Sequence, residues 1–280
     1  MNSFNLYNKT TLEIAKKITT NYSTSFSIGT RLLGASIRDH IYAIYGFVRV
    51  ADEIVDTFHQ FDKQQLLDEF TRDTYLAIDR KISTNPVLHS FQHTVNTFNI
   101  DRSLIDAFLK SMSFDLDKSN YDESSINEYI YGSAEVVGLM CLQIFVNGNK
   151  QQFEQLKPYA QSLGAAFQKV NFLRDIGHDY NELGRSYFPG IDINHLSEVN
   201  ISSIFKDIEH DFQHALTGIN RLLASSKFGV YVAYVYYYNL FEKLKKNKHL
   251  LMKKRIRISN SKKLYLIFKA WFKLKAVSYE

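Results

Sequence analysis

The sequence predicts an all-α protein built as a single domain. Only three prolines and twelve glycines occur in 280 residues, and long stretches contain neither. Sandwiches and barrels need turn residues at a much higher density. Hydrophobic residues form 45% of the chain, which is enough for a core. No repeat, low-complexity tract or long linker divides the sequence, so residues 1–280 are expected to fold together.

Capping residues place the helices of the first half. Small polar residues accept hydrogen bonds from the first free N–H groups of a helix, and proline fits its first position. The expected starts are Ser36 for residues 36–58, Asn85 with Pro86 at the first helical position, Asp101 for residues 102–114, and Ser125 with Glu128 as a capping box before residues 129–148.

In the second half, a long helix is expected to begin near Pro158 and to continue to about Leu183. Gly184 then supplies the left-handed residue that ends many helices. Further helices, for about eight to ten in all, are expected over residues 201–226, 229–247 and 261–275.

The single cysteine, Cys141, has apolar neighbours and is expected to pack as a small hydrophobe rather than to act as a nucleophile. One cysteine cannot form an intrachain disulfide, which fits a reducing cytoplasm. The N-terminal residues lack the pattern of a secretory signal, and no apolar run approaches the roughly 18 residues of a membrane span. A cytoplasmic protein is expected, either soluble or peripheral at the inner face of the membrane.

The positive charge is concentrated at the C-terminal end. Residues 241–280 carry thirteen Lys and Arg against Glu242 and Glu280, a net +11, so residues 1–240 are at −6 within the total of +5. Apolar residues and Trp271 alternate with these cations, a pattern typical of nucleic-acid binding, of an anionic membrane surface, or of a solvated helix face. We expect a solvated face for most of the lysines, with membrane contact as the alternative and no nucleic-acid partner.

Two apolar helical rows end in carboxylates. Residues four apart lie about 40° from each other around a helix, so each row projects to one side, here the side that faces the core. The rows are Ile44, Val48, Asp52 and Asp56, and Leu163, Phe167, Asn171, Asp175 and Asp179.

Paired carboxylates on a core-facing side repel each other and are costly to keep ionised without cations. Mg²⁺ binds few protein carboxylates and completes its shell with water and phosphate oxygens, so the pairs indicate a metal-bridged diphosphate. Arg49 and Arg174, each beside one pair, could contact the same diphosphate. Taken singly, each pair is more typical of solvated acids at a helix end. Two pairs on two apolar rows favour a substrate with a charged head and a hydrocarbon tail, such as an allylic diphosphate that ionises.

Five segments carry a family resemblance: "YSTSF" (22–26), "AIYGFVRVADEIVD" (43–56), "YIYGSAEVVGLM" (129–140), "GAAFQKVNFLRDIGHDY" (164–180) and "GRSYFP" (184–189). In order and spacing they resemble the squalene/phytoene synthase family of head-to-head prenyl-diphosphate condensing enzymes, and bacterial phytoene synthases most. The resemblance implies an all-α isoprenoid-synthase bundle around a central apolar cavity, with three Mg²⁺ ions during turnover.

The resemblance also implies roles for individual residues. The metal ligands would be Asp52, Asp56, Asn171, Asp175 and Asp179, with the four aspartates and Tyr45 acting in catalysis. The substrate contacts would be Ser23, Ser25, Arg49, Gln168, Arg174, Arg185, Tyr187 and Tyr237.

The sequence departs from the family pattern at several positions. His178 is about 80° around the helix from the shared face of the aspartates, so we expect a surface or supporting residue rather than a ligand. Tyr22 and Thr24 replace a His and a Lys that are common there, which leaves one diphosphate contact in doubt. Glu135 replaces a frequent Gly, and we expect it to pair with a nearby arginine.

The family's reaction implies that two geranylgeranyl diphosphates form phytoene through a cyclopropylcarbinyl diphosphate and proton loss, without NADPH. Downstream carotenoid enzymes would then be partners. The alternatives are a squalene or dehydrosqualene synthase that uses farnesyl diphosphate, because cavity depth cannot be read from the sequence, and a non-catalytic assembly factor.

A different class of enzyme, a di-iron bundle, is suggested by two acid–histidine pairs spaced by three residues. A di-iron site needs such pairs on two separate helices, whereas both fall within residues 207–214, so a solvated polar face is favoured. The pairs are Asp207 with His210 and Asp211 with His214.

Overall fold

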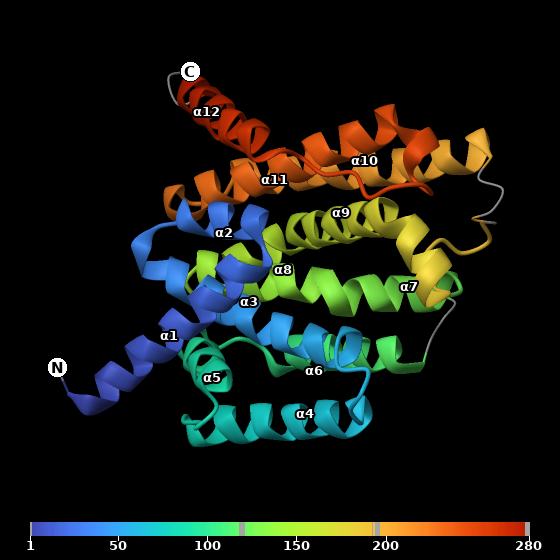
Figure 1. The fold of residues 1–280 in the computed structure, drawn as a ribbon. Helices are drawn as coiled ribbons and strands as arrows, with labels where there is room; N and C mark the ends of the chain where they lie inside the picture. Colours follow the sequence, from blue (N-terminus) through green and yellow to red (C-terminus); the bar gives the residue numbers. More distant parts are fainter. Residues whose placement is uncertain (1, 118–120, 192, 194–196, 278–280) are drawn as a thin grey trace.

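The computed structural model describes residues 2–117, 121–191, 193 and 197–277, and it confirms the all-α prediction (Figure 1). Twelve α-helices occur in the described residues, more than the eight to ten expected. They are α1 (Ser3–Tyr22), α2 (Thr24–Arg31), α3 (Ala35–Asp56), α4 (Lys63–Arg80), α5 (Pro86–Phe98), α6 (Arg102–Asp117), α7 (Glu123–Ile130), α8 (Val136–Phe145), α9 (Lys150–Leu183), α10 (Glu198–Asn220), α11 (Ala224–Lys246) and α12 (Asn260–Val277).

The helices pack around two main groups of buried side chains. One centres on Phe47 of α3, whose ring stacks on that of Phe91 with centroids 3.8 Å apart, and it joins α3 to α6 and α8. The other centres on Phe212 of α10 and joins α9 to α12. In Figure 1, α3, α8 and α9 run through the middle of the molecule between these groups, so the helices with the acidic rows lie where the two halves meet.

Two of the predicted caps are confirmed. The side-chain oxygen of Asn85 accepts hydrogen bonds from the backbone N–H groups of Val87 and Leu88, at 3.0 and 3.3 Å, with Pro86 at the first helical position. Asp101 accepts from the N–H of Ser103 at 2.9 Å. These side chains satisfy donors that have no partner within the helix.

The capping box predicted at Ser125 and Glu128 is wrong. The helix begins earlier, and Asp122 accepts from the N–H of Ser125 at 2.7 Å while Ser125 Oγ accepts from the N–H of Asp122 at 2.9 Å. Asp122 is an equally good cap and lies one turn upstream. The continuous helix expected beyond it is also interrupted by a π-helical turn over Tyr131–Glu135.

Pro158 does not lie near the start of the long helix. Asn149 caps α9, which runs through Pro158 in its interior and ends, as predicted, at Gly184 with φ +63°. Proline leaves the carbonyl four residues earlier without its helical donor. That carbonyl belongs to Glu154, which is exposed, so water can satisfy it and the helix continues.

Within the described residues, none of the helices combines the length and the apolarity that a membrane crossing needs. Cys141 packs against the first core group, and burial raises the pKa of its thiol to about 12, which fits the predicted apolar role.

Candidate functional site

A polar pocket of about 820 Å³ lies between the C-terminal ends of α3 and α9 and the segment that follows α11. Asp56 of α3 lines it together with Asp175 and Asp179 of α9. Asp52 lies one turn behind Asp56, close enough for their charges to interact. The two predicted acidic pairs therefore meet at one site, although they are more than a hundred residues apart in the sequence.

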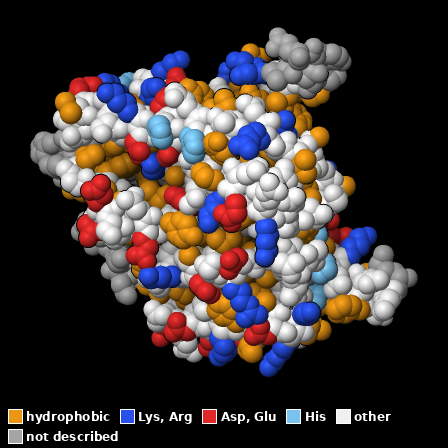
Figure 2. Space-filling view, turned by 180° about the vertical axis from the view of Figure 1, so that it is seen from behind, with side chains coloured by type: hydrophobic (Ala, Val, Ile, Leu, Met, Phe, Trp, Pro, Cys, Tyr) orange, Lys and Arg blue, Asp and Glu red, His pale blue; other side chains and the backbone are white. Residues whose placement is uncertain are grey.

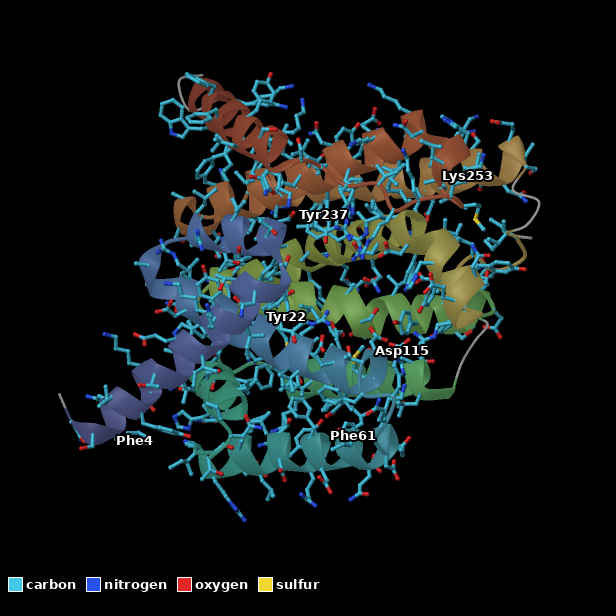
Figure 3. The ribbon with its side chains drawn as sticks, viewed as in Figure 1. Phe4, Tyr22, Phe61, Asp115, Tyr237 and Lys253 are labelled. Carbon is cyan, nitrogen blue, oxygen red and sulfur yellow. The ribbon has the colours of Figure 1, made fainter. Side chains whose placement is uncertain are left out.

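A fifth acid, Asp115 of α6, belongs to the same group and was missed from the sequence. Its side chain is only 5% exposed, and both carboxylate oxygens accept hydrogen bonds from the hydroxyl of Tyr129, at 3.0 and 2.9 Å. Its charge interacts with those of Asp56 and Asp179. Figure 3 labels it between the α3 side and the α9 side of the site.

The missed acid carries the same signal as the predicted ones. Leu104, Phe108, Ser111 and Asp115 are all buried and form a row that ends in a carboxylate. The row steps by four, three and four residues, so a search by four alone does not find it, although such spacing also follows one face of a helix.

Burial and mutual repulsion raise the pKa values of these acids. The pKa of Asp52 rises to about 8, first because of burial and then because of Asp56. That of Asp115 rises to about 7 through burial and Asp56, and that of Asp179 to about 6 through burial and Asp175. A cluster of buried carboxylates favours the binding of cations, because a cation offsets both the desolvation of the carboxylates and their mutual repulsion.

Arginine side chains compensate part of this negative charge. Arg185 lies between two helices: its Nη1 is 3.7 Å from carboxylate oxygens of both Asp56 and Asp115, and its Nη2 donates to the carbonyl of Asp115 at 2.7 Å. Arg185 also hydrogen-bonds Tyr187, whose ring stacks on Phe172 with centroids 4.2 Å apart. The predicted loop residues Arg185 and Tyr187 thus close the acidic end of the pocket.

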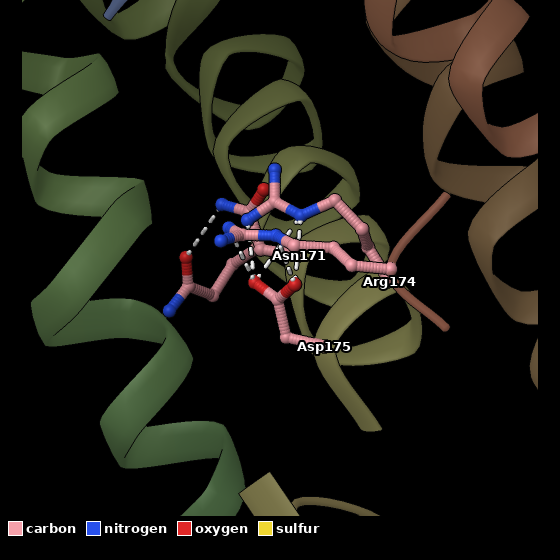
Figure 4. A network of polar contacts seen from close by, with 5 residues as sticks. Asn171, Arg174 and Asp175 are labelled. Atoms are coloured by element: carbon pink, nitrogen blue, oxygen red, sulfur yellow. Dashed lines mark hydrogen bonds and ion pairs between the residues drawn. The ribbon is translucent and has the colours of Figure 1, made fainter. Parts of the chain in front are cut away.

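Two guanidinium groups bind the carboxylate of Asp175 (Figure 4). Arg174 Nη2 lies 2.6 Å from Oδ2, and Arg255 Nε lies 2.7 Å from Oδ1. Arg255, in the segment between α11 and α12, was not predicted, because nothing in its sequence separates it from the neighbouring Lys253 and Lys254. Gly177 lets this segment approach α9, since a Cβ there would lie 2.7 Å from the carbonyl oxygen of Met252.

Arg49 is placed beside the first acidic pair, as predicted, but it is already partnered. It hydrogen-bonds Glu53, and its Nη1 is 3.8 Å from Asp52. Its guanidinium carbon lies 4.5 Å from the ring centroid of Tyr22, a cation–π contact. The tyrosine that departs from the family pattern therefore holds Arg49 in place.

Asn171 offers an observation on metal binding. Among the described residues, nothing donates to its buried Oδ1, while its Nδ2 lies 3.5 Å from Oε1 of Gln168. An oxygen without a donor, on the turn before Asp175, suits a hard cation. No three of the described carboxylate, histidine or cysteine side chains converge closely enough to hold an ion by themselves. The residues therefore fit Mg²⁺ only if water and substrate oxygens complete its shell.

An apolar cavity of about 270 Å³ adjoins the polar pocket. Phe167 lines the cavity and Gln168, the next residue, lines the pocket. Tyr45 lines the cavity with its ring stacked on Phe26 at 4.7 Å, and Tyr237 stacks on Phe167 at 3.9 Å. The predicted aromatic residues Tyr45 and Tyr237 are thus held close to the boundary between the two compartments.

The predicted serines lie at the start of α2 and line neither compartment. Ser23 Oγ accepts from the N–H of Phe26 at 3.2 Å, which caps α2, and Ser23 also hydrogen-bonds Tyr45. Ser25 is half-buried. His178 is exposed and lies 3.2 Å from Glu182, as expected for a surface residue, but it also lines the polar pocket.

Two other expectations concern acids outside the site. Among the described residues, Glu135 accepts from the amide of Gln161 at 2.8 Å, so the pairing expected with an arginine is wrong. Lys169 Nζ lies 2.6 Å from Asp207 and 2.7 Å from Asp211. A lysine thus occupies the carboxylates that a di-iron site would require.

The fold and the site together define an all-helical bundle in which a polar pocket, lined by aspartates and three arginines, adjoins an apolar cavity. The chain belongs to the squalene/phytoene synthase family, because a sequence model of that family matches residues 19–262. Members of the family are prenyltransferases that join two prenyl groups head to head.

Individual relatives agree with this assignment. Phytoene synthase 1 of Solanum lycopersicum is 30% identical over 277 residues, which cover 89% of this chain and 64% of the relative. The 4,4'-diapophytoene synthase of Staphylococcus haemolyticus is 29% identical over 201 residues, covering 70% and 66%. The crystal structure of a dehydrosqualene synthase superposes with a TM-score of 0.85 at 22% identity, over 98% and 99% of the two chains, and shows the same fold. The chain spans less than two thirds of the length of the Solanum relative.

Proposed function

We propose that this protein condenses two geranylgeranyl diphosphates to phytoene with the help of Mg²⁺, of which three ions act during turnover. The observation that carries the proposal is the junction of the two compartments: Asp56, Asp175 and Asp179 line the polar pocket together with three arginines, and an aromatic-walled apolar cavity begins at the adjacent residue of α9. A diphosphate head and a prenyl tail need this pair of environments side by side.

The reaction has two ionisation steps. In the first, one C–O bond breaks, the diphosphate leaves with the bonding electrons, and the double bond of the second substrate attacks the allylic cation and loses a proton. The product is a cyclopropylcarbinyl diphosphate. In the second step, its diphosphate leaves, the cyclopropane rearranges, and loss of another proton gives phytoene. No reductant is consumed, so no NADPH is expected.

The residues around the polar pocket would bind the diphosphate. Arg174 and Arg255 already lie within 3.0 Å of a carboxylate and can turn the same guanidinium groups to phosphate oxygens, which they bind in a bidentate manner. Asp52, Asp56, Asn171, Asp175 and Asp179 would hold Mg²⁺, which when bound would stabilise the negative charge on the leaving diphosphate.

The residues of the cavity would protect the cation. Tyr45, Phe26, Phe167 and Tyr237 present stacked rings near the boundary, and aromatic faces stabilise positive charge. The lining beyond them is apolar, which excludes the water that would quench a carbocation.

Two substrates of different chain length, geranylgeranyl and farnesyl diphosphate, are candidates. Relatives named phytoene synthase include the Solanum lycopersicum protein, which favours the longer substrate. The relative named 4,4'-diapophytoene synthase, at 29% identity, keeps farnesyl diphosphate as the second candidate.

The deciding experiment incubates the purified protein with Mg²⁺ and radiolabelled geranylgeranyl or farnesyl diphosphate, with and without NADPH, and analyses the extracted hydrocarbons. We expect a C40 product from the first substrate that does not depend on NADPH. A C30 product formed only from farnesyl diphosphate would replace phytoene with dehydrosqualene or squalene. No hydrocarbon from either substrate, while Asp175→Asn behaves identically, would indicate a non-catalytic protein.

A further inference from the structure

Helix α12 exposes an apolar face. Leu264, Tyr265, Phe268 and Phe272 are 55–64% exposed, and Trp271, which contacts Phe272, is 40% exposed. At about 100° per residue, these five side chains fall within an arc of roughly 120°. They form one continuous stripe, which we call the α12 stripe.

The opposite face of the helix fixes it to the protein. Leu266 and Ala270 are each 1% exposed and pack within the second core group. The hydroxyl of Tyr236 in α11 donates to the carbonyl of Lys263 at 2.8 Å. The α12 stripe therefore cannot turn inward without breaking these contacts, and it faces away from the body of the molecule.

Cations flank the stripe on one side. Lys262, Lys269 and Lys273 are exposed and fall within about 40° of each other, next to the stripe and between it and the buried face. Residues 260–277 contain five lysines and no acid. Figure 2, seen from behind, shows blue and orange side chains together at the top of the molecule, where this helix lies.

We propose that α12 docks on an anionic lipid surface, with the α12 stripe in the acyl boundary and the three lysines at the headgroups. An exposed apolar arc beside a cationic arc is the pattern of helices that lie in a membrane interface. Aromatic residues are favoured at that depth. A second copy of α12 would bring only further lysines and no carboxylate, so self-association offers no complementary charge.

The position of α12 beside the cavity gives the membrane contact a function. α12 packs on the outer side of α11, and Gly229, Val230 and Ala233 of α11 line the apolar cavity. One helix thus separates the lipid-facing surface from the cavity that would hold the hydrocarbon. A protein docked in this way keeps its apolar cavity close to the acyl chains.

The test compares flotation with phosphatidylcholine vesicles, with and without phosphatidylglycerol. Phe268→Ser with Phe272→Ser removes part of the stripe, and Lys269→Glu with Lys273→Glu reverses the flank. The matched controls are Phe4→Ser with Phe61→Ser, exposed rings that lie far from α12 (Figure 3), and Lys16→Glu with Lys17→Glu on α1. Circular dichroism checks that every variant is folded.

We expect the wild type and both controls to float with the anionic vesicles. The phenylalanine variant should lose at least about a hundredfold in partitioning, since full burial of each of its two rings contributes at least about tenfold. The lysine variant should lose about 30-fold or more, since each cation at an anionic surface contributes roughly fivefold. Equal flotation of variants and controls would overturn the proposal. So would absence of flotation combined with a dimer, seen by sedimentation velocity, that the stripe variant abolishes.

Discussion

Asp52→Asn should remove a large part of the pH dependence of stability in the metal-free protein. Burial and the adjacent Asp56 raise the pKa of Asp52 to about 8 from its ordinary 3.8. Between these values the native state holds a proton that the unfolded state has released. Unfolding therefore releases that proton, and the free energy of unfolding falls as the pH rises through this window.

The magnitude follows from one proton. Its release lowers the free energy of unfolding by at most about 1.4 kcal/mol per pH unit, or about 2.7 kcal/mol from about pH 5 to about pH 7. Asparagine cannot release a proton, so the variant should lose this part of the slope. A residual slope remains, because the pKa values of Asp115 and Asp179 are raised to about 7 and about 6.

Urea unfolding at several pH values in the presence of a chelator, followed by circular dichroism, measures the slope. Asp101→Ala serves as control: a hydrogen bond from the Ser103 N–H lowers the pKa of Asp101, so this acid is ionised in both states over the window. The control should lose about 1 kcal/mol of cap energy at every pH without a change of slope. Parallel curves for the wild type and Asp52→Asn would show that the carboxylate ionises freely in the native state and would refute the reasoning.

Three further predictions concern single contacts. Arg255→Ala removes a guanidinium from the polar pocket and should raise the KM for prenyl diphosphate about tenfold. The control Arg257→Ala lies outside the pocket lining and should leave the KM nearly unchanged. Equal effects of the two substitutions in steady-state assays would count against a diphosphate role for Arg255. Tyr129→Phe removes the hydrogen-bond donor to the buried Asp115 and should lower the free energy of unfolding in urea by about 1–3 kcal/mol. The pKa of Asp115 should also rise further, because the hydrogen bond from Tyr129 lowers that pKa in the wild type. A variant as stable as the wild type would contradict this prediction. Gly218→Ala should lower the Tm, because the added Cβ would lie 2.2 Å from Cβ of Tyr159. The overpacking costs about 1–3 kcal/mol, which should exceed the gain in helix propensity of about 1 kcal/mol. A raised Tm would show that α9 and α10 can move apart.

Site residues could be predicted from the sequence where a local pattern also determines which side of the helix faces the core. The acids of α3 and α9 end apolar rows, and those rows had to face the core, so their meeting was predictable. Caps such as Asn85 were predictable for the same local reason. The cap at Ser125 was not predictable, because Asp122, one turn upstream, could cap the helix equally well and only packing selects between them.

The missed residues depend on contacts between distant segments. Arg255 is one cation among many in a basic segment, and only the approach of that segment to Gly177 places it on Asp175. Asp207 and Asp211 resemble metal ligands in sequence, yet Lys169 of another helix occupies them. Which cation meets an acid is decided by packing, and no spacing along one helix encodes it.

Helix α9 carries both ends of the site on one rigid rod. Leu163 in the cavity wall and Asp179 in the polar pocket are 16 residues apart, about 24 Å along the axis. The distance between the headgroup end and this wall therefore cannot be lengthened without breaking the helix. A variant that accepts a longer or shorter substrate must gain or lose room through the other walls, on α2, α3, α8, α10 and α11, while α9 acts as a fixed ruler against which chain length is measured.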